Sequence, residues 1–148
     1  MKMINIKPIE EVYPNVINIE GVWDSEKAYS YIPMIKSFGY EILLPKNNED
    51  DDTLVLFRCG DLYGVLLFEW GDYLCPHEAL FECRSYEELD RIRQSMHSSI
   101  KWGSREEMID YVHNLEWSLL SEHTEWRIID FLREVKDILI KNNLKKVK

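Results

Sequence analysis

Two apolar segments joined by a Gly-Asp pair place the tightest constraint on the fold of this chain. Residues 53–59 and 63–70 are rich in the branched and aromatic side chains that favour strands. Gly60-Asp61 lies between them and is typical of turns that join antiparallel strands. The second segment contains the nearly continuous apolar run 64–68. Such a run predicts a central strand that is covered on both faces.

Further short β-type segments extend this predicted sheet. Val16–Ile19 and Tyr40–Leu44 precede the hairpin, and Tyr73–Cys75 and His77–Cys83 follow it, separated by Pro76. Because these segments are short and bounded by Gly, Asp or Pro, they predict an antiparallel or mixed sheet of about five or six strands.

One helix is predicted before the hairpin. Asp24 or Ser25 can cap it, and four apolar residues then follow at helical spacing, namely Ala28, Tyr31, Ile35 and Phe38. Pro33 lies inside this pattern and predicts a kink or two short turns. Gly39 predicts the end of the helix.

Three helices are predicted in the C-terminal half. Ser85-x-x-Glu88 and Ser104-x-x-Glu107 are capping boxes, each followed by an apolar stripe, and Thr124 can cap a third helix. Trp117 and Trp126 flank the connection between the last two helices and are predicted to lock it. The chain is thus predicted to be one α+β domain over residues 1–148, with helices packed on the sheet.

The charge balance bears on the class of partner. The 148 residues carry a net charge of −9, and the last eight of them contain four lysines and no acid. Without this basic tail, residues 141–148, 14 basic residues stand against 27 acidic ones, a net charge of −13. Such a body disfavours nucleic acid, whose binding depends on neutralising phosphates. Lysines at the end of a helix complement its dipole.

Composition and patterning also bear on location. The three cysteines form no spaced framework, and neither a secretory segment nor an apolar run long enough for a membrane span is present in the sequence. The interpretation is a cytoplasmic protein with reduced thiols and no membrane partner.

Catalytic and metal chemistry is weakly represented. Cys75 and His77 could face the same way on an extended segment, with Cys59 or Cys83 approaching as further zinc ligands, but no tight CxxC pair is present. His113 or His123 could pair with Glu116 or Glu122. Without a nucleophile motif or a phosphate-binding loop, no cofactor, metal or catalytic residue is predicted.

A binding surface is better represented than a catalytic site. A run of four carboxylates, Glu49, Asp50, Asp51 and Asp52, occupies the acidic loop 46–52, and Asp61 and Asp72 lie in later turns. Large aromatic residues stand close to these acids in the sequence, namely Tyr63, Trp70 and Tyr73. Aromatic anchors beside carboxylates are typical of surfaces that bind basic proteins.

The sequence therefore favours a non-catalytic, acidic protein that binds and inhibits a basic partner. One concrete form is an immunity protein that blocks a nucleic-acid-cleaving toxin, and a phage-type anti-defence protein would use the same physics. The alternative is a small hydrolase that uses His and carboxylate pairs, with an optional metal at Cys75 and His77.

Overall fold

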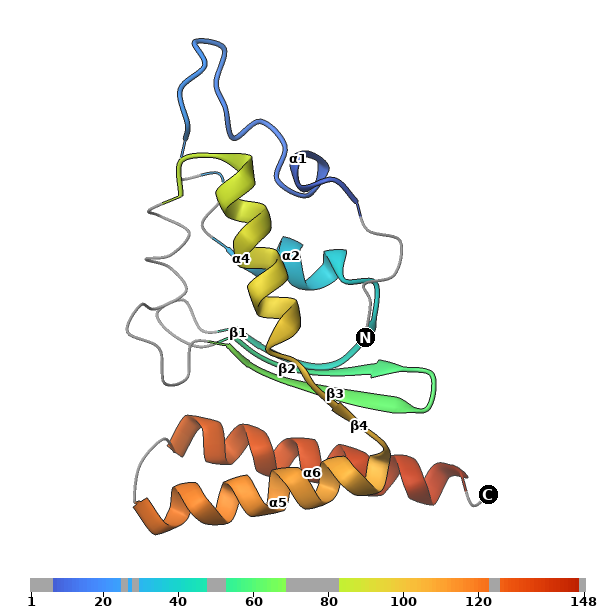
Figure 1. Ribbon diagram of the computed structural model, residues 1–148. Helices are drawn as coiled ribbons and strands as arrows, with labels where there is room; N and C mark the ends of the chain where they lie inside the picture. Colours follow the sequence, from blue (N-terminus) through green and yellow to red (C-terminus); the bar gives the residue numbers. More distant parts are fainter. Residues whose placement is uncertain are drawn as a thin grey trace.

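The computed structural model describes residues 7–24, 27, 30–47, 53–68, 83–122 and 126–146. These residues form an antiparallel four-stranded sheet with helices on both faces (Figure 1). The strands are β1 (Glu41–Asn47), β2 (Thr53–Cys59), β3 (Leu62–Phe68) and β4 (Lys101–Gly103), and they lie side by side in this order. The predicted α+β class is confirmed.

The β2–β3 hairpin matches the prediction closely. Cys59 pairs with Leu62 across the two-residue Gly60-Asp61 turn, and the register continues without a break to the pair Thr53 and Phe68. Gly60 has a φ of +61°, a left-handed value that glycine adopts without strain. A two-residue turn with glycine in its first position matches the twist of the flanking strands, so it fixes their register.

Five α-helices form in the described residues. They are α1 (Ile9–Val12), α2 (Ile32–Ser37), α4 (Tyr86–Ser98), α5 (Arg105–Glu122) and α6 (Trp126–Lys146). Figure 1 shows α1, α2 and α4 on one face of the sheet and the antiparallel pair α5 and α6 on the other. The three predicted C-terminal helices are present, and α6 includes the basic tail as far as Lys146.

The alternation of side chains along β2 builds two hydrophobic cores. Val55 and Phe57 belong to the first core, with α1, α2 and α4, whereas Leu54 and Leu56 belong to the second, with α5 and α6. Successive residues of a strand point to opposite faces, so a strand covered on both faces is apolar throughout. The two-sided burial predicted for the second strand of the hairpin is confirmed, because β3 contributes Leu66 to the first core and Val65 to the second.

The predicted number of strands is wrong for the described residues, which form four. The segment Val16–Ile19 makes a single bridge, from Ile17 to Trp23, and does not join the sheet. The predicted strands Tyr73–Cys75 and His77–Cys83 lie outside the described residues, apart from Cys83 itself. Single isolated pairs of this kind arise where a turn closes locally, which a β-type composition alone does not distinguish from a strand.

The predicted N-terminal helix begins later than expected. Pro33 stands in the first turn of α2, where its missing N–H is not needed, so it starts the helix instead of kinking it. Gly39, with a φ of +82°, follows the helix as predicted. Ile35 and Phe38 are buried in the first core, so the spacing of the apolar residues predicted the buried face of the helix correctly. The predicted start of the helix was wrong.

The two capping boxes form at the predicted positions. The Ser85 hydroxyl accepts a hydrogen bond from the backbone N–H of Glu88, and the Ser104 hydroxyl accepts one from that of Glu107. In the second box the Glu107 carboxylate also accepts from the backbone N–H of Ser104, which completes the reciprocal pattern. These hydrogen bonds fix the starts of α4 and α5, and burial of Leu89 and Met108 anchors the same helices.

Strand β4 was not expected, and Gly64 explains how it fits. Gly64 of β3 pairs with Trp102 of β4, and a Cβ atom at position 64 would lie 2.7 Å from Ile100 Cγ2 and 2.9 Å from the Trp102 ring. The indole therefore covers the space that the glycine leaves open. The sequence does not predict this strand, because three residues are too few to show an alternating pattern.

Replacement of Gly64 by Ala is expected to destabilise the protein by about 1–3 kcal/mol, because the added methyl group must displace Ile100 or Trp102 in a packed layer. Urea unfolding followed by circular dichroism measures the loss. Asn114→Ala on the exposed face of α5 is the matched control and should change stability by less than about 0.5 kcal/mol. Equal unfolding midpoints for the two variants would contradict the proposed contact.

Candidate partner-binding surface

One end of the sheet brings the two parts of the predicted binding surface together. Asn47 pairs with Thr53, and Thr53 pairs with Phe68, so the ends of β1, β2 and β3 form one row. In the sequence, the run Glu49–Asp52 connects Asn47 to Thr53, and Trp70 follows Phe68 by two residues. Both segments are therefore attached to the same edge of the sheet.

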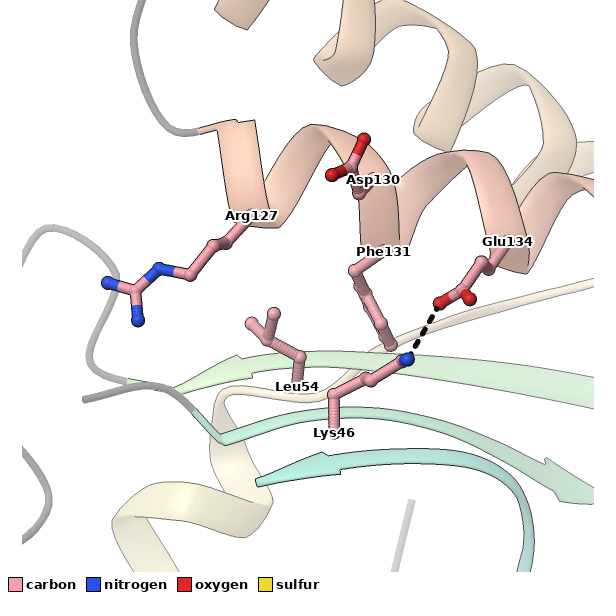
Figure 2. A pocket seen from close by; sticks show the side chains of 6 residues that line it. All are labelled: Lys46, Leu54, Arg127, Asp130, Phe131 and Glu134. Carbon is pink, nitrogen blue, oxygen red and sulfur yellow. Dashed lines mark ion pairs between the residues drawn. The ribbon is translucent and has the colours of Figure 1, made fainter. Parts of the chain in front are cut away.

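Helix α6 begins at this same edge. Lys46 of β1 forms an ion pair of 3.3 Å with Glu134 of α6, and both side chains are about half exposed. A cavity of about 500 Å³ lies beside this pair, and Figure 2 shows Phe131 of α6 and Leu54 of β2 on its inner side. Arg127 and Asp130 also line the cavity. The edge therefore has an apolar floor with charges of both signs around it.

Two tryptophans are exposed beside the connection between α5 and α6. Trp117, in the last turns of α5, is 69% exposed, and Trp126, the first residue of α6, is 55% exposed. The prediction that they lock the connection is wrong, because residues so exposed contribute little packing. Indole rings exposed to this extent are the type of side chain that protein interfaces bury. Both residues lie beside a turn, and there the sequence does not distinguish a packed tryptophan from an exposed one.

We call this region the loop end. It consists of the row Asn47, Thr53 and Phe68, the first turns of α6, and Trp117 and Glu122 of α5. Figure 1 shows the start of α6 and the row of strand ends on the same side of the molecule. Exposed carboxylates of the described residues in this region are Glu122, Asp130 and Glu134.

The structure separates two of the predicted site residues from the loop end. Asp61 is exposed in the turn at the opposite end of the hairpin, about 20 Å away along the seven residues of β2. Tyr63 is also near that turn, and its side chain is 1% exposed in the second core. Tyr63 is therefore a core residue, because alternation on β3 points it towards α5 and α6. The other predicted residues, Glu49, Asp50, Asp51, Asp52, Trp70, Asp72 and Tyr73, lie outside the described residues.

The possible acid–base pair of His113 and Glu116 is not formed. Glu116 is buried between α5 and α6, where its carboxylate accepts hydrogen bonds from Arg133 Nε at 2.7 Å and Lys136 Nζ at 2.9 Å. Burial by itself raises the pKa of Glu116, but these two hydrogen bonds outweigh it and hold the pKa below its usual value. His113 is exposed. Glu116 thus fastens the two helices together, and the other proposed pair includes His123, which lies outside the described residues.

The cysteines of the described residues do not form a metal site. Nowhere in these ranges do three His, Cys, Asp or Glu side chains come together as ligands. Cys83 is buried, and its burial raises the pKa of the thiol to about 11. Cys59 is half-buried beside the first core. Cys75 and His77, which the metal hypothesis also needs, lie outside the described residues.

His97 belongs to an aromatic cluster that sequence reasoning did not find. Its Nε2 atom lies 2.7 Å from the Tyr40 hydroxyl, its ring stacks on Tyr40, and Phe38 packs against it edge-on. Burial lowers the pKa of His97 and raises that of Tyr40. A neutral imidazole can therefore accept the hydrogen bond that the Tyr40 hydroxyl donates. The cluster joins the segment before β1 to α4, and Phe38 and Tyr40 belong to the first core.

The lowered pKa of His97 predicts a pH-dependent contribution to stability. The unfolded chain takes up a proton on this side chain near pH 6.5, whereas the folded chain does so only at lower pH, so folding is weakened as the pH falls below about 6.5. We expect His97→Gln to lose less stability between pH 7.5 and pH 5 than the wild type, measured by urea midpoints. His113→Gln is the control at an exposed position. Parallel pH profiles for the wild type and His97→Gln would contradict this assignment.

Neither a membrane-spanning helix in the described residues nor a similar known protein indicates the function of this chain. Among the helices described, none has an apolar stretch long enough to cross a lipid bilayer. Comparison of the chain with protein-family models, with curated proteins and with solved structures finds no match. The arrangement of the described residues is therefore the basis for inferring the function.

Proposed function

We propose that this chain is a non-catalytic binding protein that inhibits a basic protein partner through its loop end. An immunity protein that blocks a nucleic-acid-cleaving toxin is the most concrete form of this proposal. The observation that carries it is the register Asn47–Thr53–Phe68, which attaches the acidic run and the segment of Trp70 to one edge of the sheet.

Exposed tryptophans beside that edge support the proposal. Trp117 and Trp126 together offer large, rigid and partly polar surfaces, and such side chains supply much of the binding energy of protein interfaces. Their placement beside exposed carboxylates such as Asp130 and Glu122 combines an apolar anchor with negative charge. A basic protein with an apolar depression next to its cationic surface is the matching partner.

The mechanism that follows is occlusion. The carboxylates of the loop end take the place of phosphate groups over the basic cleft of the partner, while one tryptophan fills an apolar depression beside it. Negative potential at the tip of an acidic protein also speeds the encounter with a cationic surface, since opposite fields guide the two molecules before they touch. The net charge of −9 acts in the same direction.

The competing hypothesis of a small hydrolase finds less support in the described residues. Two side chains with shifted pKa values hold elements together: Glu116 joins α5 to α6, and His97 joins α4 to Tyr40, the residue before β1. Catalytic groups are instead expected to converge in a concave pocket with shifted pKa values. The cavity at the loop end is lined by Lys46, Asp130 and Glu134, among which the pair of Lys46 and Glu134 is already formed.

The partner is sought by capture from a lysate of the source cells at low and at high salt, followed by identification and purification. Replacement of Glu49–Asp52 by Gln and Asn is then expected to slow its association and to flatten the salt dependence of the rate, because steering depends on long-range charge. Stopped-flow kinetics at several salt concentrations measures both effects.

A charge-matched control tests whether the position of the acids matters. Four acids away from the loop end, Glu41, Asp61, Glu106 and Asp110, are exposed and can be replaced in the same way, which leaves an equal net charge. The control variant should associate at nearly the rate of the wild type. If both variants slow the association equally, net charge is sufficient and the loop end has no special role.

Trp126→Ala is expected to weaken binding to the same partner by about 2 kcal/mol or more, roughly thirtyfold, if this ring is an anchor of the interface. Because Trp126 is 55% exposed, folding stability should change little, which thermal unfolding can verify. Isothermal titration calorimetry measures the affinity, and Ile140→Ala, another exposed apolar residue of α6, is the matched control. Unchanged affinity in both Trp126→Ala and Trp117→Ala would exclude the tryptophans as anchors.

A further inference from the structure

A second surface, independent of the loop end, is formed by a turn that stands out from the fold. Figure 1 shows this segment, before α2 in the sequence, as the blue loop that extends beyond α1 and α4 at the top of the molecule. Its two sides are joined by the bridge between Ile17 and Trp23. We call residues 17–23 the projecting turn.

The projecting turn is held in one conformation by its own hydrogen bonds. The Asn18 side-chain oxygen accepts from the backbone N–H groups of Glu20 and Val22, each at 2.9 Å. The backbone N–H of Asn18 donates to the Val22 carbonyl at 2.8 Å, and Gly21 adopts a φ of +79°. At the base, Trp23 packs edge-on against Tyr86 of α4. The turn is therefore pre-organised, which lowers the entropy cost of any contact that it makes.

Its tip is apolar. Ile19 is completely exposed, with 102% of its reference surface accessible, and Ile17 and Val22 are about half exposed on either side of it. Glu20 is the charged residue of the projecting turn. Isolated exposed apolar residues are common, but three of them on a rigid projection are typical of an interaction site.

The same molecule carries a groove of matching character between α1 and α2. The groove has a volume of about 350 Å³, and Val12 and Pro33 supply its apolar lining. Among the described residues at this groove, Lys7 and Lys36 outnumber the acid Glu11, which gives them a net charge opposite to that of Glu20. Ser37 and Gly39 also line the groove. We call it the α1–α2 groove.

We propose that the projecting turn of one molecule docks in the α1–α2 groove of a second copy of this chain. Ile19 then enters the groove against Val12 and Pro33, and Glu20 lies next to Lys36. Two-fold symmetry lets each copy donate its turn and receive that of the other. This reciprocity doubles the contact, which matters because stable dimers bury about 1,200 Å² or more in total.

The charge of the whole molecule does not prevent this contact. Two bodies of net charge −9 repel each other, but at physiological salt the Debye length is about 8 Å, so repulsion between distant charges is largely screened. A Glu–Lys contact within the docked groove is screened less than charges spread over the surface. The inference is independent of the proposed function, because neither surface belongs to the loop end.

Sedimentation velocity of the purified full chain from about 1 to 100 µM tests the proposal. The wild type should dimerise, and Ile19→Asp should weaken dimerisation at least tenfold, because it places a charged side chain against Val12 and Pro33. Ile140→Asp, at an exposed apolar position on α6, should leave the dimer intact. Circular dichroism and thermal unfolding establish that each variant is folded, which is expected because both side chains are exposed.

A charge exchange identifies the groove as the acceptor. Glu20→Lys and Lys36→Glu should each weaken the dimer, and the double variant should recover at least part of the loss. A wild type that stays monomeric over the whole concentration range would overturn the proposal. So would a dimer that is insensitive to Ile19→Asp, or one that the double variant does not restore. If the monomeric chain instead sediments with phosphatidylcholine vesicles and Ile19→Asp abolishes this, the tip binds lipid and the dimer is excluded.

Discussion

The register of the β2–β3 hairpin determines most of this structure. Seven successive pairs, from Cys59 with Leu62 to Thr53 with Phe68, follow from one two-residue turn at Gly60. Because side chains alternate along a strand, this register assigns each apolar residue to one of the two cores. A slip by one residue would exchange the two sets and leave α5 and α6 facing side chains meant for α4. Gly60, which adopts the left-handed conformation without strain, is therefore a small residue with a large structural effect.

The same register determines where the connecting segments are attached at the surface. Whatever follows β1 and β3 is attached at the row of Asn47, Thr53 and Phe68, whereas the Gly60-Asp61 turn lies at the other end of the hairpin. Helix α6 is placed at that row by its packing on Leu54 and by the ion pair of Lys46 with Glu134. The loop end is thus a consequence of how the core is built.

The fold could be predicted from the sequence wherever short-range chemistry decides the outcome. The capping boxes at Ser85 and Ser104 and the apolar hairpin each contain their own structural signal within a few residues. Strand β4 exists because Trp102 finds the open surface of Gly64, a partner 38 positions away that no local pattern reveals. The prediction of which aromatic side chains are buried was wrong for the same reason. Whether Tyr63 or Trp126 is exposed depends on where α5 and α6 pack, and both residues carry the same aromatic signal in the sequence.

The distribution of charged groups separates structural roles from the proposed binding role. Arg93, Glu116 and His97 are buried or half-buried, and each is satisfied by a partner from its own or a neighbouring element. Removal of one member of such a set leaves the other buried and unpaired, which destabilises the fold. The contacts of these groups therefore indicate a structural role. At the loop end, by contrast, the indole rings of Trp117 and Trp126 and the carboxylates of Glu122 and Asp130 are exposed. A surface that combines exposed indole rings with carboxylates, beside a core whose polar groups are already satisfied, is more consistent with recognition than with chemistry.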